Sequence, residues 1–179
     1  MNFIKKGLLA FFATLFLIFI VGLFLPGEYK IIRTHDYKCA PEYVFDYISN
    51  INNMDDWFYI SKSLDSTLQY KYKNDSLGGL SSVEWNGEAM GQGVLKIDNL
   101  IKHKLIKMDL AFQNNSVSKS SKFEIMFDNG ITTVKWTDYG EHGWNPVHRI
   151  FGLFIDGFLG PDMEKSLQKI EKKLECKNV

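Results

Sequence analysis

The sequence has few of the residues that build metal, disulfide-rich or nucleic-acid sites. It contains two cysteines, four prolines and four histidines in 179 residues, and its 21 basic residues balance 21 acidic ones. With no Cys-x-x-Cys pair, a zinc ribbon or a thioredoxin-type motif is excluded. Because no clustered basic surface is indicated, nucleic acid is not expected as a partner.

The motifs of common enzyme classes are also missing. The chain has no His-Glu-x-x-His, no Gly-x-Ser-x-Gly, no P-loop and no phosphate-binding glycine fingerprint. Its histidines, which lack metal-ligand spacing, are His35, His103, His142 and His148. No metal and no cofactor are therefore expected, and binding is favoured over catalysis, although an enzyme stays an open alternative.

One long apolar run is present near the N-terminus. No charge occurs from Gly7 to Gly27, and Lys5 and Lys6 come just before. The segment 7–25, at about 1.5 Å per residue, spans roughly 28 Å, close to a bilayer core of about 30 Å. This predicts a transmembrane helix that ends at Pro26. A cleaved signal peptide is the alternative, but the run is long for one and no small-x-small cleavage site follows it.

The run divides the chain into an anchor, residues 1–27, and one domain, residues 28–179. The lysines before the run favour an N-terminus inside the cell, with the domain on the extracytoplasmic side. Lys30, Arg33 and Lys38 follow the run closely, so the charge count on its two sides is nearly balanced.

Hydrophobic periodicity predicts the elements of the domain. A strand is expected over 28–38, a helix from Pro41, and a short helical stretch over 54–59. From Ser66 to Gly140 the period is two, which predicts six antiparallel strands; Asp128-Asn129-Gly130 predicts a tight hairpin.

A long helix is expected from Asn145-Pro146 almost to the end of the chain. An interruption is expected near Gly157 and Gly160-Pro161, with a kink at the proline. The first half is apolar nearly all round, so a curved sheet is expected to cover it. The order strand, two helices, six strands, long helix predicts an α+β helix-grip fold, in which an antiparallel sheet wraps the last helix.

The sequence also suggests candidate site residues. Glu84 is a weak catalytic candidate, because it would be a buried base only if its strand turned Trp85 outward; Trp85 facing inward is favoured. Cys39 and Cys176 would join the start of the domain to its end in an oxidising compartment, with two separate thiols as the alternative. A ligand cavity is predicted to be lined by Tyr70, Trp85, Met108, Phe127, Trp136, Phe154 and Phe158, which could otherwise pack as a closed core.

Several stretches together carry a family resemblance: Gly22 to Pro26, Ala40 to Ile48, Val83 to Gly87, Thr133 to Trp136, and Asn145-Pro146 with Gly160 to Leu167. With these, the sequence resembles membrane-anchored polyketide cyclase/dehydrase-like proteins of the START/Bet v1-like (SRPBCC) superfamily. The resemblance implies the helix-grip fold and a cavity for a hydrophobic ligand, but no particular reaction.

Three functions follow as hypotheses. The first is a membrane-anchored module that binds a hydrophobic small molecule or lipid. The second is a cyclase/dehydratase-type enzyme with a carboxylate in the cavity. The third is an envelope protein-interaction module whose contact surface includes Trp57 to Tyr59 and the charged tail helix.

Overall fold

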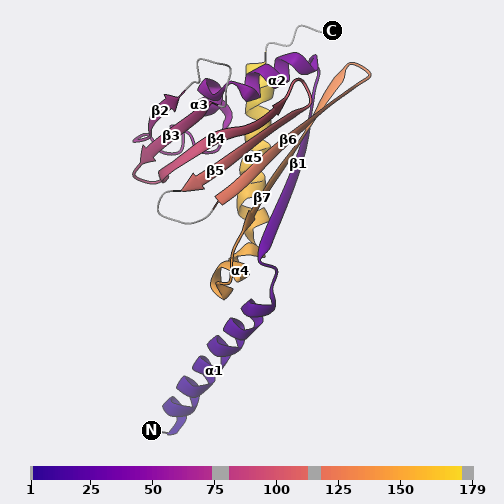
Figure 1. The fold of residues 1–179 in the computed structure, drawn as a ribbon. Helices are drawn as coiled ribbons and strands as arrows, with labels where there is room; N and C mark the ends of the chain where they lie inside the picture. Colours follow the sequence, from indigo (N-terminus) through magenta and orange to yellow (C-terminus); the bar gives the residue numbers. More distant parts are fainter. Residues whose placement is uncertain (1, 74–80, 113–117, 175–179) are drawn as a thin grey trace.

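The computed structural model describes residues 2–73, 81–112 and 118–174 (Figure 1). Seven strands form one antiparallel sheet in the order β1-β7-β6-β5-β4-β3-β2. The elements are α1 (Asn2–Phe24), β1 (Glu28–Tyr37), α2 (Pro41–Ser49), the 3-10 turn η1 (Ile51–Asn53), α3 (Met54–Trp57), β2 (Gln69–Lys73), β3 (Ser82–Gly87), β4 (Gly91–Ile101), β5 (Leu105–Phe112), β6 (Ser118–Asp128), β7 (Ile131–Glu141), α4 (Pro146–Gly152) and α5 (Ile155–Lys173).

This is the predicted α+β helix-grip arrangement. The six strands β2 to β7 follow one another as neighbours, which confirms the meander. The β6–β7 hairpin turns through Asn129 and Gly130, whose φ angles of 49° and 81° are both left-handed. A two-residue turn of this kind matches the twist of the strands, so it fixes the register in which β6 pairs with β7.

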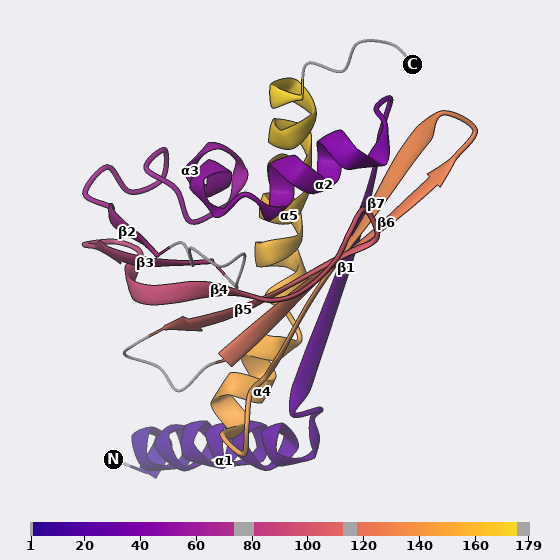
Figure 2. The same cartoon turned by 45° about the horizontal axis from the view of Figure 1, so that its top comes forward.

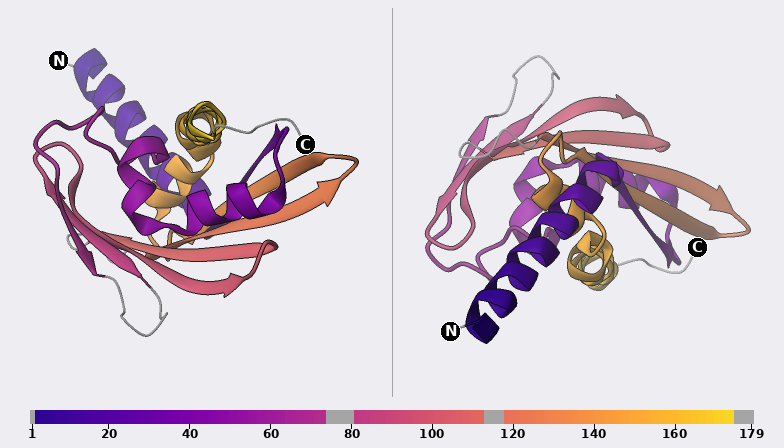
Figure 3. Two further views of the ribbon diagram at one scale, coloured as in Figure 1. Left: turned by 90° about the horizontal axis from the view of Figure 1, so that it is seen from above. Right: turned by 90° about the horizontal axis from the view of Figure 1, so that it is seen from below.

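The concave face of the sheet is filled by side chains. Seen from above, α2 and α3 lie within its curve, with α5 alongside (Figure 3). Trp57 of α3 packs edge-on against Phe123 and Trp136 of the sheet, with ring centroids 5.9 and 6.0 Å apart. All three rings are buried. The segment from Trp57 to Phe58 is therefore core, and the prediction of an exposed contact surface there was wrong.

Strand β1 holds α5 along its length. The Tyr37 hydroxyl donates to the Leu167 carbonyl over 3.0 Å, and His35 Nε2 lies 2.9 Å from the Glu171 carboxylate. Arg33 extends toward the start of the helix, where its guanidinium lies 2.9 Å from Asp156. These contacts position α5 at the β1 edge of the sheet.

The C-terminal helix breaks earlier than predicted. α4 ends at Gly152 and α5 begins at Ile155, whereas Pro161 lies inside α5. The chain turns at Phe154, whose φ and ψ are −105° and −5°. Pro161 removes one donor, to the Gly157 carbonyl, but the helix continues through it. The predicted interruption at Gly157 and Gly160-Pro161 was therefore wrong.

The apolar first half of this helical region is not covered by the sheet, which corrects a second prediction. α4 packs instead against the end of α1, at the tip of the domain opposite the end of α5 (Figures 1 and 2). A Cβ at Gly22 would lie 2.8 Å from the Pro146 Cβ and 3.1 Å from Ile150 Cδ1, so the two helices touch closely. The large side chains of Phe151 and Phe154 remain exposed.

Among the described residues, α1 is a helix long and apolar enough to cross a membrane. Within its segment Phe3–Phe24, an 18-residue window has a mean hydropathy of 2.7 and is almost entirely exposed. The orientation with the N-terminus inside stays a prediction.

Candidate functional site

A groove lies between the start of β6 and the first turns of α5. It has a volume of about 350 Å³, at the lower end of the roughly 300–1,000 Å³ typical of small-molecule sites. The lining combines apolar walls with one charge of each sign: Phe151, Ile155, Phe158 and Leu159, with Lys119 and Asp162.

Close to the groove, the sheet buries a carboxylate. Asp138 of β7 follows Val134 and Trp136 at a spacing of two, so its side chain points into the domain with them. Its carboxylate accepts hydrogen bonds of 2.9 Å from the hydroxyls of Tyr29 and Ser121. Burial raises the pKa of Asp138, although both hydrogen bonds and the charge of Lys119 oppose the rise.

Two side chains connect this buried cluster electrostatically with the groove. Lys119, a groove residue, holds its ammonium 5.6 Å from the centre of the Tyr29 ring. Burial raises the pKa of Tyr59 well above its usual value, and the charges of Asp138 and Asp162 raise it further.

The cluster offers unused hydrogen-bonding capacity. Among the described residues, neither the Tyr59 hydroxyl nor Nε2 of His142 has a hydrogen-bond partner, although both are buried. His142 packs against Tyr29 with ring centroids 5.2 Å apart. Burial lowers the pKa of His142, and the charges of His148 and Lys119 lower it further, which favours the neutral ring.

A carboxyl with a raised pKa keeps its proton to higher pH and can act as a general acid. Phenols with raised pKa values, such as Tyr59, remain donors and can bind a carbonyl or hydroxyl oxygen.

The structure does not bring the seven predicted cavity residues together. Met108 and Trp136 are buried in the closed core, and Phe127 is exposed near the β6–β7 hairpin. Phe154 is exposed between α4 and α5, whereas Phe158 lines the groove. As ligand contacts these residues stay predictions.

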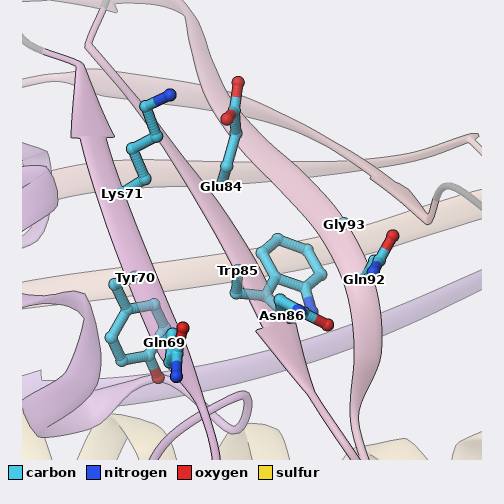
Figure 4. A pocket seen from close by; sticks show the side chains of 8 residues that line it. All are labelled: Gln69, Tyr70, Lys71, Glu84, Trp85, Asn86, Gln92 and Gly93. Atoms are coloured by element: carbon cyan, nitrogen blue, oxygen red, sulfur yellow. The ribbon is translucent and has the colours of Figure 1, made fainter.

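Tyr70, Trp85 and Glu84 meet at a different hollow, of about 310 Å³, over β2, β3 and β4 (Figure 4). The Trp85 ring faces inward and is buried, so the favoured register is the one observed. Glu84 points to the other face and pairs with Lys73, whose hydrogen bond lowers the pKa of the glutamate. The Tyr70 hydroxyl is already engaged by Asp55 and the Ile60 carbonyl.

Sequence reasoning missed Asp138. The signal was present, since an acid occupies the third position of an alternating series whose first two members are Val134 and Trp136. The structure adds that Tyr29 and Ser121 come from neighbouring strands to satisfy it. In the described part of the chain, no group of three or more acids, histidines or cysteines could hold a metal ion.

Cys39 is buried just before α2. Cys176 lies outside the described residues, so the pairing of the two cysteines stays a prediction.

Neither a protein-family model nor a curated protein sequence matches the chain. Solved structures do resemble it. The Zhui aromatase/cyclase of a Streptomyces species aligns at a TM-score of 0.58 and 12% identity, over 83% of this chain and 96% of that one.

The di-domain aromatase/cyclase BexL aligns at 0.60 and 11% identity, over 84% of this chain and 51% of the other. A protein of Chromobacterium violaceum (CV1439) aligns at 0.55 and 13%, over 83% and 98%. At these identities the likeness concerns the fold alone: the chain has the helix-grip fold that is also found in polyketide aromatase/cyclases.

Proposed function

We propose that this protein is a membrane-anchored module that binds a hydrophobic small molecule or lipid in the groove between β6 and α5. The observation that carries the proposal is the groove itself, about 350 Å³ with four apolar walls. A site of this composition suits an acyl chain or a flat apolar ligand. The helix-grip fold and the apolar α1 support the same function.

The polar groups at the groove indicate an amphipathic ligand. Lys119, a hydrogen-bond donor, and Asp162, an acceptor, are the two charged residues of the lining. A ligand with a polar head and an apolar body would pair its head with Lys119 and Asp162 while its body packs against Ile155 and Leu159. Burying the body there removes apolar surface from water.

The proposal is tested by native mass spectrometry of the full-length protein, purified from membranes in a mild detergent. We expect a reproducible added mass that organic extraction removes. Ile155→Trp should fill the groove and abolish the added mass. The matched variant is Ile131→Trp, at the exposed β6–β7 hairpin, which should retain it. A clean unliganded mass, or an added mass that Ile155→Trp leaves unchanged, would contradict the proposal.

A second candidate function, a dehydratase-type enzyme, is favoured by Asp138. In this reaction the Asp138 carboxyl would have to carry a proton and give it to a leaving hydroxyl, which departs as water; it would regain a proton from the adjacent carbon as a double bond forms. Glu84 cannot take this part, because it lies in a surface ion pair with Lys73.

The two functions differ in what the purified protein carries. If Asp138 catalyses dehydration, the molecule retained by Asp138→Asn should be heavier by one water than the molecule retained by the native protein. Identical ligand masses in the two proteins would exclude this reaction and leave the binding function standing.

A further inference from the structure

The part of the domain that packs against α1 carries large exposed apolar side chains. They come from the loop after β7, from α4 and from the start of α5. We call them the apolar platform, and its members are Trp144, Val147, Phe151, Leu153, Phe154 and Phe158. Several large apolar side chains exposed within one short stretch of chain are typical of a protein or membrane contact site.

The contacts of α1 fix the level of the platform along that helix. Gly22 touches Pro146 and Ile150 of α4. From Gly22 to Phe24, where α1 ends, the rise is about 3 Å at 1.5 Å per residue. If α1 spans a bilayer, α4 lies near the boundary between acyl chains and headgroups.

Arg149 holds this geometry in place. Its Nη1 donates to the carbonyls of Leu23 and Leu25 over 2.8 and 3.1 Å, and its Nε donates to the Gly143 carbonyl over 2.8 Å. Carbonyls at a helix end lack partners within the helix, and in lipid such groups must be satisfied internally. The same guanidinium lies 5.2 Å from the Trp144 ring.

We propose that the apolar platform is inserted in the interfacial layer of the bilayer that α1 spans. The occupant of this surface is therefore lipid, because α4, which carries Val147 and Phe151, packs against the end of the helix that would span the bilayer. Tryptophan is enriched in the interfacial layer, and apolar faces of interfacial helices enter it by about 5–10 Å.

The consequence concerns where the ligand comes from. Phe151 and Phe158 belong to both the platform and the groove lining. Platform insertion would therefore open the groove directly on the acyl chains, so the ligand would enter from the membrane. This inference rests on the proposed function, because it requires an inserted α1.

Tryptophan fluorescence can test the platform without any knowledge of the ligand. Trp144 is 84% exposed, whereas Trp57, Trp85 and Trp136 are each exposed by 3% or less. The full-length protein is placed in phosphatidylcholine nanodiscs whose acyl chains carry bromine, a quencher. Because Trp144 is one of four tryptophans, we expect bromine to remove roughly a quarter of the emission, and aqueous iodide to remove almost none.

Substitutions show whether the quenched emission comes from Trp144 and whether the quenching depends on the platform. Trp144→Phe should abolish the bromine quenching. Phe151→Glu combined with Phe154→Glu should lower it at least twofold and make Trp144 accessible to iodide, while α1 keeps the protein in the membrane. Phe127→Glu is the matched control, since Phe127 is also exposed but lies near the distant hairpin, and should change nothing.

The outcomes separate this inference from the proposed function. Quenching of Trp144 by iodide and not by bromine, in protein that resists carbonate extraction, would overturn platform insertion and leave the anchored binding module intact. Protection from both quenchers together with a dimeric mass would assign the platform to a second copy of the chain and also overturn it. Release of the protein by carbonate would overturn both the inference and the anchor.

Discussion

Replacing Asp138 by alanine should lower the thermal midpoint of the domain by roughly 8–16 °C. The substitution removes the acceptor for two buried hydroxyls, those of Tyr29 and Ser121. Each hydroxyl stranded without a partner costs about 1–3 kcal/mol, so the total is about 4 kcal/mol in the middle of the range. For a chain of this length, 1 kcal/mol shifts the midpoint by about 2–4 °C.

Asp138→Asn should cost less, because the amide keeps the shape and an acceptor oxygen, and it should also change the pH dependence. The pKa of Asp138 is raised in the folded protein, so the folded state binds more protons than the unfolded state between the unfolded and the folded pKa. The raised pKa of this carboxyl therefore stabilises the fold most at pH below the ordinary pKa of about 4. This stabilisation is lost as the pH rises through the pKa of the folded state.

The assay is thermal unfolding of the full-length protein in detergent, followed by near-ultraviolet circular dichroism across a pH series. The deficit of Asp138→Asn relative to the native protein should shrink as the pH rises, since only the native protein loses stability to ionisation at this position. Other titrating groups are common to both proteins and cancel in the difference. A deficit that grows with pH, or a loss under about 2 °C for Asp138→Ala, would refute the reasoning.

Four other outcomes are expected. Hydrogen bonds from Thr67 and from backbone amides lower the pKa of Asp65 to about 2. The stability that ionised Asp65 gives the fold should therefore be lost as the pH falls from about 4 to about 2. In that window, the thermal midpoint of Asp65→Asn should depend less on pH than that of the native protein. Glu84→Gln should leave the added mass in native mass spectra unchanged, because the side chain pairs with Lys73 on the surface, and loss of the ligand would count against the site described above. If Cys39 and Cys176 pair, the denatured but unreduced protein should resist alkylation, whereas labelling at both residues would show separate thiols. Gly22→Leu places a side chain where even a Cβ would be 2.8 Å from Pro146, so it should expose Trp144 to iodide; unchanged protection would argue that α1 and α4 do not need to touch.

Much of the fold could be predicted from the sequence because the local signals agree with the tertiary structure. The alternation over Ile106, Met108 and Leu110 predicts a strand with one buried face, and all three side chains are buried. The Asn129-Gly130 turn has the left-handed backbone that its residues favour. Alternating patterns predict a strand and its buried side correctly when the apolar side chains are the ones that face the core.

The platform could not be predicted for the converse reason. Phe151, Phe154 and Phe158 have the spacing of a core helix, and nothing in a periodic pattern distinguishes burial against a sheet from exposure beside α1. The break after Gly152 was missed because Pro161 gives the stronger sequence signal, although the helix runs through it. Asp138 was missed because a buried carboxylate depends on partners from other strands, which only the register reveals.

The three hydrogen bonds of Arg149 have a mechanical consequence. They replace a flexible tether by a fixed joint between the last turn of α1 and the loop before α4. In a bilayer, a domain joined to α1 in this way cannot rotate freely, so the groove keeps one orientation relative to the membrane plane. A lipophilic molecule would then reach it by a two-dimensional search within the leaflet, and the rate of capture would follow lateral diffusion rather than escape into water.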